Sequence, residues 1–245
     1  MTTASLSLSL EELETLSPEQ LLQWAHAEHG DRAGIITSFQ DTGSVIVDLA
    51  QRVAPGLRVL TVDTLRLHPE TYALLERMEQ RYGITIERFT PDPERLRRMV
   101  EQHGEYLFFD TKAKQEFCCE VRKVGPNQRA LATLDVWFTG LRRDQSAFRK
   151  ATPKVSRVKQ PDGRHILKIA PLADWTQEEV DAYLEAHAVP KNTLYEQGYT
   201  SIGCMICTTP TRAGEDKRAG RWRWLNQHSA GEKKECGIHT FASGI

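Results

Sequence analysis

The chain has 245 residues, of which 40% are hydrophobic and 27% are charged. This composition supports a packed core and excludes an intrinsically disordered chain. The 32 basic and 33 acidic residues leave a formal net charge of −1, which excludes a globally polycationic nucleic-acid binder. No apolar run reaches the roughly 18–20 residues of a membrane helix. Residues 1–16 contain no Lys or Arg and do not resemble a secretory signal, so we expect a cytoplasmic protein with no membrane partner.

Predicted strands and helices alternate along most of the chain. Residues 1–16 are expected to be flexible, and the first helix begins at a capping signal in which Ser17 is the N-cap and Gln20 lies three residues on. A second capping signal covers residues 176–179. We predict strands at residues 33–39, 58–62, 84–89, 134–140 and 166–170, and helices that end at Gly30, Val53, Gly83 and Gly104.

This alternation predicts an α/β fold with a mostly parallel sheet and helices on both faces. The sequence contains no internal repeat and no low-complexity linker. We expect one α/β domain over residues 17–215 and an irregular, mobile C-terminal tail over residues 216–245.

The polar segment of residues 38–44 follows a predicted strand and precedes a predicted helix. Ligands of open α/β sheets bind beyond the carboxyl ends of the strands, and a helix N-terminus there favours phosphate or sulfate. An ordinary polar loop fits the same residues equally well. The side chains and the glycine that would line such a turn are Ser38, Asp41, Thr42, Gly43 and Ser44.

Two groups of basic residues favour an anionic substrate. Residues 142–159 contain seven basic residues and one acidic residue, and they begin directly after a predicted strand. Arginine is suited to bidentate capture of tetrahedral oxyanions. Nucleic acid is the rival ligand, and the net charge disfavours it. The second basic group, which interleaves with Trp222 and Trp224, is Lys217, Arg218, Arg221 and Arg223.

The pairing of the cysteines predicts a metal centre. Cys118 and Cys119 are adjacent, Cys204 and Cys207 form a Cys-x-x-Cys motif, and Cys236 stands alone. Four thiolates suit a tetrahedral metal ion or a cubane iron–sulfur cluster. Adjacent side chains diverge and so are better placed to bind two irons of a cluster than one zinc ion. Four unrelated buried thiols are the alternative interpretation.

Cys236 is a candidate nucleophile. Nearby positive charge on Lys233, Lys234 and His239 would lower the pKa of its thiol and raise the thiolate fraction. A single activated cysteine is typical of covalent catalysis, although an incidental surface thiol has the same sequence pattern. No second free cysteine remains beside Cys236.

Six blocks of sequence resemble one known family. They include Cys-Cys-x-x-Arg-Lys, Thr-Gly-x-Arg-Arg-Asp-Gln-Ser and Lys-Glu-Cys-Gly-Ile-His, and they occupy residues 63–72, 118–123, 139–146, 198–208, 220–222 and 234–239. The chain resembles the assimilatory adenylyl-sulfate (APS) reductases, which are cluster-bearing relatives of the 3′-phosphoadenylyl-sulfate (PAPS) reductases. It departs from them at Leu65, where the family usually has glycine.

The resemblance implies an adenine-nucleotide α-hydrolase-like, Rossmann-like domain that holds one [4Fe–4S] cluster on Cys118, Cys119, Cys204 and Cys207. It implies that Cys236 attacks the sulfonyl sulfur of adenylyl sulfate and releases AMP. A thioredoxin- or glutaredoxin-type reductant then frees sulfite from the S-sulfocysteine, as a step of sulfate assimilation. The resemblance also implies catalytic roles for Lys123 and His239, and substrate binding by Ser38, Asp41, Gly140, Arg149, Arg218 and Arg221.

Three other functions compete with APS reduction. PAPS could be the substrate of the same mechanism. ATP-dependent tRNA thiolation shares the broad fold, but the segment of residues 38–44 lacks the Ser-Gly-Gly-x-Asp-Ser pattern of ATP pyrophosphatases. In a metal-stabilised binding module, Cys236 would be dispensable. A homo-oligomer stays a hypothesis for the assembly state.

Overall fold

The computed structural model describes residues 8–226, in which six strands form one sheet. β1 pairs in parallel with β2 on one side and with β4 on the other, and β5 runs antiparallel to β6 at the sheet edge. The predicted α/β fold with a mostly parallel sheet is therefore confirmed. The sheet order is β3-β2-β1-β4-β6-β5, with bounds β1 (Ala33–Ile36), β2 (Arg58–Val62), β3 (Ile86–Phe89), β4 (Val136–Phe138), β5 (Val155–Lys159) and β6 (His165–Ile169).

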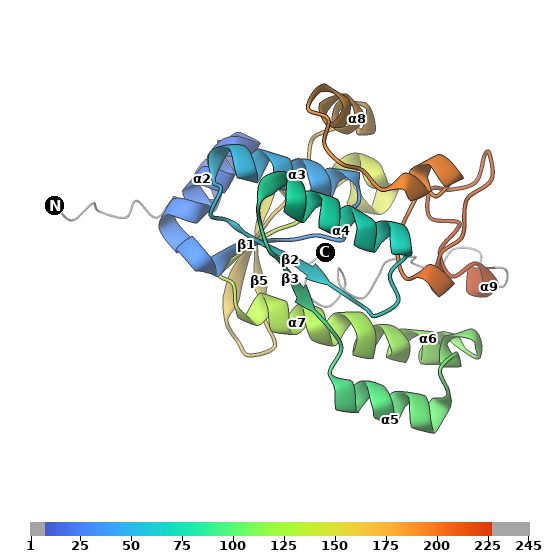
Figure 1. Ribbon diagram of the computed structural model, residues 1–245. Coiled ribbons are helices and arrows are strands. Elements are labelled where there is room, and N and C mark those ends of the chain that lie inside the picture. Colours follow the sequence, from blue (N-terminus) through green and yellow to red (C-terminus); the bar gives the residue numbers. More distant parts are fainter. Residues whose placement is uncertain (1–7, 227–245) are drawn as a thin grey trace.

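Helices cover both faces of this sheet (Figure 1). Helices α2, α3 and α4 lie on one side, and α6 and α7 lie on the other. No helix within residues 8–226 is both long enough and apolar enough to span a membrane. The helices are α1 (Leu10–Thr15), α2 (Pro18–His29), α3 (Asp41–Val53), α4 (Pro69–Tyr82), α5 (Pro93–His103), α6 (Lys112–Cys119), α7 (Gly125–Ala132), α8 (Gln177–Ala186) and α9 (Arg223–Asn226).

Local capping chemistry sets the helix starts that the sequence predicted. The Ser17 hydroxyl accepts a hydrogen bond from the Gln20 amide at 3.2 Å, and the Gln20 side chain accepts one from the Ser17 amide at 2.8 Å. Thr176 and Glu179 form the same reciprocal pair at the start of α8. Such a pair satisfies two backbone donors that the helix itself cannot.

The N-terminal segment differs from the expected flexible stretch. Residues 8–16 contain α1, which has its own capping box between Ser9 and Glu12. Leu13 is 1% exposed, and the Lys154 ammonium donates to the carbonyl of Leu16 at 2.6 Å. The sequence signal for a flexible segment was misleading because α1 is stabilised by contacts with β5, far along the chain.

The C-terminal segment also differs in part from the mobile tail that we expected. Residues 216–226 are packed: Arg221 pairs with Thr208 in an antiparallel bridge, and Arg221 and Trp222 are 4% and 8% exposed. Cys236 and His239 lie outside the described residues.

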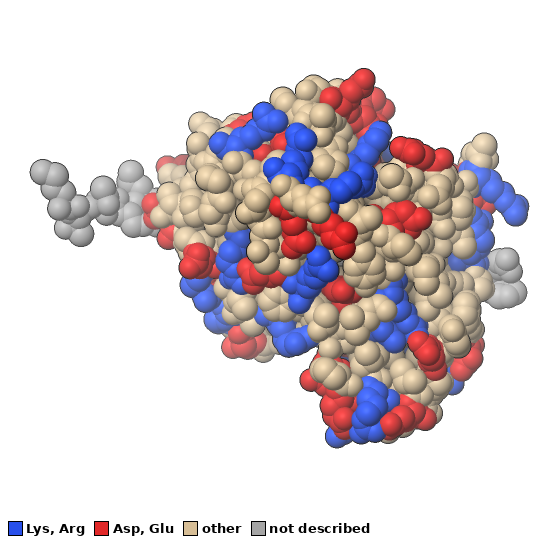
Figure 2. Space-filling view, in the orientation of Figure 1, with Lys and Arg blue, Asp and Glu red and all other residues tan. Residues whose placement is uncertain are grey.

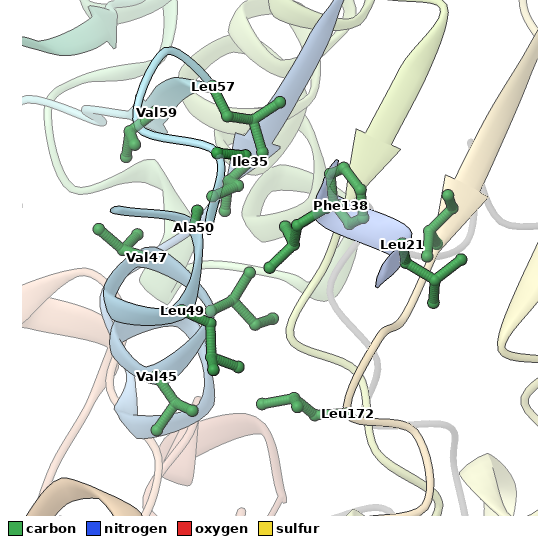
Figure 3. Close-up of a cluster of buried hydrophobic side chains, with 14 of the residues drawn as sticks. Leu21, Ile35, Val45, Val47, Leu49, Ala50, Leu57, Val59, Phe138 and Leu172 are labelled. Atoms are coloured by element: carbon green, nitrogen blue, oxygen red, sulfur yellow. The ribbon is translucent and has the colours of Figure 1, made fainter. Parts of the chain in front are cut away.

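The main core fills the layer between the sheet and helices α2, α3, α4 and α8. Figure 3 shows Ile35 of β1 and Phe138 of β4 in one buried cluster with Leu49 of α3. Parallel strands covered by helices on both faces are apolar along their length, as β1 and β4 are here. This packing fixes α3 against β1, and its first turn therefore has a defined position at the sheet edge.

A buried carboxylate joins three helices at the back of this core. Asp48 of α3 is 1% exposed, and it accepts hydrogen bonds at 2.7 Å from the hydroxyl groups of Tyr82 and Tyr183 and from the Arg52 guanidinium. Burial disfavours the charged carboxylate, yet these three donors outweigh it and hold the pKa of Asp48 below its usual value.

We predict that Asp48→Asn lowers the free energy of unfolding by about 2–4 kcal/mol at pH 7, because an amide has one acceptor oxygen in place of the two that Tyr82, Tyr183 and Arg52 use. A group whose pKa is lowered on folding stabilises the protein above its unfolded-state pKa. The difference between wild type and variant should therefore shrink as the pH falls below about 4. Urea denaturation between pH 3 and 8 measures this. Asp162→Asn, which alters an exposed ion pair, is the control; equal effects of the two variants would contradict the prediction.

Candidate functional site

A cleft of about 1270 Å³ opens at the carboxyl edge of the sheet. It lies where the connections from β1 and β4 diverge, which is the usual ligand position in open α/β sheets. The structure brings together at this cleft every candidate that the sequence assigned to the substrate and that lies within residues 8–226. These lining residues are Ser38, Asp41, Gly140, Arg149, Arg218 and Arg221.

Close backbone contacts build the floor of the cleft. Helix α3 begins at Asp41, four residues earlier than the apolar pattern predicted, because the polar residues 41–44 form its first turn. A Cβ on Gly43 would lie 2.0 Å from the Thr37 hydroxyl, so only glycine allows this turn to meet β1. A Cβ on Gly140 would lie 3.4 Å from the Gly43 amide nitrogen. The two loops therefore converge, as their positions after β1 and β4 predict.

Buried arginines line the cleft, among them Arg149 and Arg221. Arg149 is 8% exposed and donates to the side-chain oxygen of Gln145. Arg221 is 4% exposed, stacks on Trp222 with 4.7 Å between the guanidinium carbon and the ring centroid, and donates to the Ile202 carbonyl at 3.4 Å. Guanidinium groups held in this way offer fixed donors to a phosphate or a sulfate.

Only some residues of the two basic groups found in the sequence line the cleft. Arg142 and Arg149 line the cleft, whereas Arg157 and Lys159 are exposed on β5. Charge clustering along a sequence therefore overstated the number of cations at the site. In the second group Lys217, Arg218 and Arg221 line the cleft, and Arg223 instead pairs with Glu215 at 2.8 Å.

The cleft also contains acidic and aromatic side chains. Asp41 is half-buried at the start of α3, and its buried Oδ1 has no hydrogen-bond partner within residues 8–226. Burial, reinforced by the nearby charge of Asp181, raises its pKa to about 6. Tyr195 lies against the Asp41 backbone, and burial raises the pKa of its hydroxyl. The sequence singled out neither Asp181 nor Tyr195, because nothing local to either residue shows that it lies near Asp41.

Four cysteines meet in a small pocket beside the cleft. Cys118 and Cys119 end α6, and Cys204 and Cys207 flank a short 3-10 turn in the C-terminal part of the fold. The structure thus brings together the two pairs that the sequence predicted as ligands of one centre. Directly after Cys119 a π-helical turn, η3 (Glu120–Val124), carries two buried cations, Arg122 and Lys123.

The loop after β2 connects both cysteine pairs. The Cys204 thiol donates to the Thr64 hydroxyl at 3.3 Å, and the Thr64 carbonyl accepts from Arg122 at 3.0 Å. The amide of Met205 donates to the Arg66 carbonyl at 2.8 Å. One loop therefore holds segments that are far apart in the sequence against each other.

The buried thiols are poor nucleophiles as they stand. Cys118 is 6% exposed, and Cys204 and Cys207 are each 7% exposed. Burial raises the pKa of Cys118, and it raises the pKa of Cys207 to about 12, although Lys123 and Arg221 oppose the shift at Cys207. Thiols in this environment stay protonated at neutral pH unless a metal displaces their protons.

The four cysteines do not form a closed set of metal ligands within residues 8–226. Among residues 8–226, no three Cys, His, Asp or Glu side chains converge closely enough to hold a metal ion. In a cluster each thiolate binds a different iron, so the sulfurs need not meet at a point. Two further features fit a bound anion: Nη1 of Arg66 and Nε of Arg122 are buried without hydrogen-bond partners in the described chain.

Lys123 joins the two halves of the site. Its side chain is 9% exposed and lines both the cleft and the cysteine pocket. The resemblance implies a catalytic role for Lys123, which stays a prediction; the structure places its side chain between the cleft and the four cysteines.

The backbone angle at Leu65 explains why the family usually has glycine at this position. Its φ of 58° lies in the left-handed region, which costs a residue with a Cβ about 1–2 kcal/mol. The Asp63 carboxylate stabilises the turn by accepting from the Leu65 amide and the Tyr72 hydroxyl, each at 2.8 Å. The chain therefore retains the turn geometry without glycine.

Charge on the visible surface is mixed. Figure 2 shows basic and acidic side chains interspersed over this face, without a broad area of one sign. Such a surface lacks the basic stripe that tracks a nucleic-acid backbone.

Comparisons with known proteins agree with this geometry. Residues 33–210 match the family model of the phosphoadenosine phosphosulfate reductase domain. The adenosine 5′-phosphosulfate reductase of Allochromatium vinosum is 43% identical over 204 residues, which cover 83% of this chain and 77% of the relative. The enzyme of the same name from Neisseria meningitidis serogroup A is 42% identical, with 94% of this chain and 90% of the relative covered.

Solved structures show the same fold. Phosphoadenylyl-sulfate reductase from Candida auris has a TM-score of 0.68 and 31% identity, and the match covers 84% of this chain and 100% of that one. Yeast FAD synthetase, at 14% identity and a TM-score of 0.53 over 86% of this chain and 70% of its own, shares the fold alone. The family model, the curated relatives and the Candida auris structure together show that the chain belongs to the phosphoadenosine phosphosulfate reductase family, a family of sulfur-reducing oxidoreductases.

Proposed function

We propose that the protein reduces adenosine 5′-phosphosulfate to sulfite and AMP. One observation carries the proposal: an oxyanion cleft with buried Arg149 and Arg221 shares Lys123 as a common wall with a pocket of four cysteines. Curated relatives that are 36–44% identical are named adenosine 5′-phosphosulfate reductases, which supports this substrate.

The cations of the cleft bind and polarise the phosphosulfate group. Arg149 and Arg221 are positioned to hold its oxygens, while Lys123 stabilises the negative charge that grows on the bridging oxygen as the bond to sulfur breaks. Cys236 supplies the nucleophile, and His239 accompanies it. The Cys236 thiolate forms a bond to the sulfonyl sulfur, and the electron pair of the sulfur–oxygen bond leaves with AMP.

An external dithiol completes the reaction. One of its thiolates attacks Sγ of the S-sulfocysteine and expels sulfite, which leaves a mixed disulfide. The second thiol of the same protein attacks that disulfide and restores the Cys236 thiol. Two electrons pass from the dithiol to the sulfonyl sulfur, so a thioredoxin- or glutaredoxin-type partner fits the chemistry.

The proposed mechanism assigns different roles to the α/β body and to the C-terminal segment. We propose that the α/β body binds the nucleotide and that the segment after residue 226 brings Cys236 to the cleft. An ATP-dependent thiolation reaction is disfavoured, because the loop before α3 does not have the ATP-pyrophosphatase sequence. A binding module would not need the anion cleft that adjoins the cysteines.

We predict that Cys236→Ser abolishes sulfite release while the affinity for AMP stays within about twofold. Wild-type protein incubated with APS and no reductant should gain the mass of one SO₃ on the peptide that contains Cys236, because the intermediate cannot then be resolved. Mass spectrometry and a sulfite assay measure these outcomes. Lys159→Ala, on the exposed face of β5, is the control. Sulfite release by Cys236→Ser, or an unmodified wild-type peptide, would overturn the mechanism.

PAPS is the second candidate substrate. The Candida auris relative is a phosphoadenylyl-sulfate reductase, and Lys191 lies at the rim of the cleft where an additional phosphate could meet a cation. Turnover of wild-type protein with APS and with PAPS under the same conditions decides between them. A higher kcat/KM with PAPS would replace the substrate that we propose.

The four paired cysteines would hold the cofactor, a [4Fe–4S] cluster. When bound, such a cluster supplies a buried charge beside the substrate anion and ties Cys118 and Cys119 to Cys204 and Cys207. The side chains now enclose about 10 Å³, so they must move apart to accommodate it. Arg122 and Lys123 supply compensating positive charge.

We predict that protein purified without oxygen contains about four iron atoms and matching sulfide per chain. Cys204→Ser should lose most of this iron, because it removes one of the four ligands, whereas Cys236→Ser should retain it. Iron and acid-labile sulfide analysis measures both variants. Zinc in place of iron, or equal iron loss in the two variants, would refute the cluster assignment.

Burial of the Asp41 carboxyl lowers the free energy of unfolding at neutral pH, and a role in substrate binding would explain why it is there. A carboxyl whose pKa rises to about 6 on folding destabilises the folded state above that pH, and the penalty disappears below the unfolded-state value of about 4. We predict that Asp41→Asn stabilises the fold at pH 7, with a gain that grows between these two pH values, and weakens APS binding about tenfold through loss of a charged acceptor. Denaturation curves and KM measure this. Asp174→Asn, an exposed carboxylate, is the control; unchanged binding and stability would contradict the prediction.

A further inference from the structure

Arg66 is a buried cation that the proposed reaction does not use. Its side chain is 9% exposed and lines the cysteine pocket. Nη2 donates to the carbonyl and the carboxylate of Glu105, at 2.7 and 3.1 Å, and the guanidinium lies 5.1 Å from the ring centroid of Phe108. These contacts fix the plane of the guanidinium and leave Nη1 buried without a hydrogen-bond partner in the described chain.

Positive charge in this pocket lacks an equivalent negative charge. Arg66 lies near Arg122, and Nε of Arg122 is likewise buried without a hydrogen-bond partner in the described chain. Glu105 pairs with Arg66, but its side chain is 58% exposed and therefore screened by water. Buried guanidinium groups with unsatisfied donors are costly, so an anion should complete the pocket.

We infer that Arg66 is a cluster-facing donor: Nη1 hydrogen-bonds the sulfur of an anionic iron–sulfur cluster on the four cysteines and thereby slows loss of iron. Glu105 and Phe108 act as positioning residues that hold the guanidinium plane toward the pocket. The inference rests on the proposed cofactor. It adds a residue from outside the four ligands, and it requires no catalytic step.

The position of Arg66 in the chain supports this role. Its backbone carbonyl accepts from Met205, which lies between Cys204 and Cys207, and its amide donates to Thr64 at 3.3 Å. Thr64 in turn accepts from the Cys204 thiol. The same residue thus contacts the Cys-x-x-Cys segment through its backbone and faces the pocket with its side chain. A guanidinium there binds sulfur from a position that is itself fixed by the ligand segment.

The experiment compares iron release from anaerobically purified, iron-loaded proteins. Each is mixed with excess ferrous chelator, and absorbance of the iron complex gives the rate. We expect Arg66→Met to release iron about ten- to a hundredfold faster than wild type, as loss of a residue supporting metal ligands does. Arg66→Lys should lie between the two, because it keeps the charge and loses the planar donor. Glu105→Gln should accelerate release less than Arg66→Met.

Arg97→Met is the matched control, since Arg97 is an arginine on α5 with a 55% exposed side chain and ion pairs to Glu94 and Glu101. Visible circular dichroism of the loaded proteins is a second readout: Arg66 variants should alter the cluster bands at equal iron content, and Arg97→Met should not. If Arg66→Met fails to fold, Arg66→Lys and Glu105→Gln carry the test.

Wild-type rates and spectra in all Arg66 and Glu105 variants that fold would overturn the inference while leaving the cofactor intact. Equal acceleration in Arg97→Met would also overturn it, since the effect would then be one of general charge. Wild-type protein that contains no iron would refute the cofactor itself, and the inference with it. These outcomes separate a failure of Arg66 from a failure of the proposed function.

Discussion

The hydrogen bonds of the loop after β2 hold the site together. Thr64 accepts from the Cys204 thiol through its hydroxyl and from Arg122 through its carbonyl, so a single residue contacts both cysteine-bearing segments. These bonds lie in a buried environment, where polar groups have no water to replace a lost partner. The position of the loop depends in turn on β2, a strand enclosed in the parallel sheet. The regular core therefore determines the geometry of the irregular C-terminal part.

The cleft carries both cations and carboxylates. Arg149, Arg221 and Lys123 line it together with Asp41, which lies at the start of α3 with Asp181 nearby. A molecule with a strongly anionic end and a neutral, hydrogen-bonding end matches this distribution. A nucleotide joined to a sulfate group is such a molecule, and the names of the curated relatives point to the same chemistry.

Much of the α/β body could be predicted because its signals are local. The Ser17 and Thr176 capping boxes and the apolar strands depend on neighbours within a few residues, and β2 begins and ends where the pattern indicated. Helix α1 was missed although it has a local capping box between Ser9 and Glu12; its position depends on β5, where the Val155 amide donates to Glu14. The strand–loop–helix pattern and the basic groups pointed to the cleft, and the family resemblance assigned the roles of its residues. Arg66 and Tyr195 were missed as site residues because only the folded chain brings them to the pockets, and Cys236 and His239 lie outside the described residues.

Gly203 lies directly under the guanidinium of Arg221: a Cβ there would come within 2.3 Å of it. This glycine immediately precedes Cys204. The segment that bears the Cys-x-x-Cys motif therefore also packs against Arg221, which lines the cleft. If these cysteines hold an iron–sulfur cluster as we propose, oxidative damage to the cluster would also displace Arg221 and weaken anion binding. An enzyme built in this way would stop consuming nucleotide when its metal is lost, without any separate regulatory element.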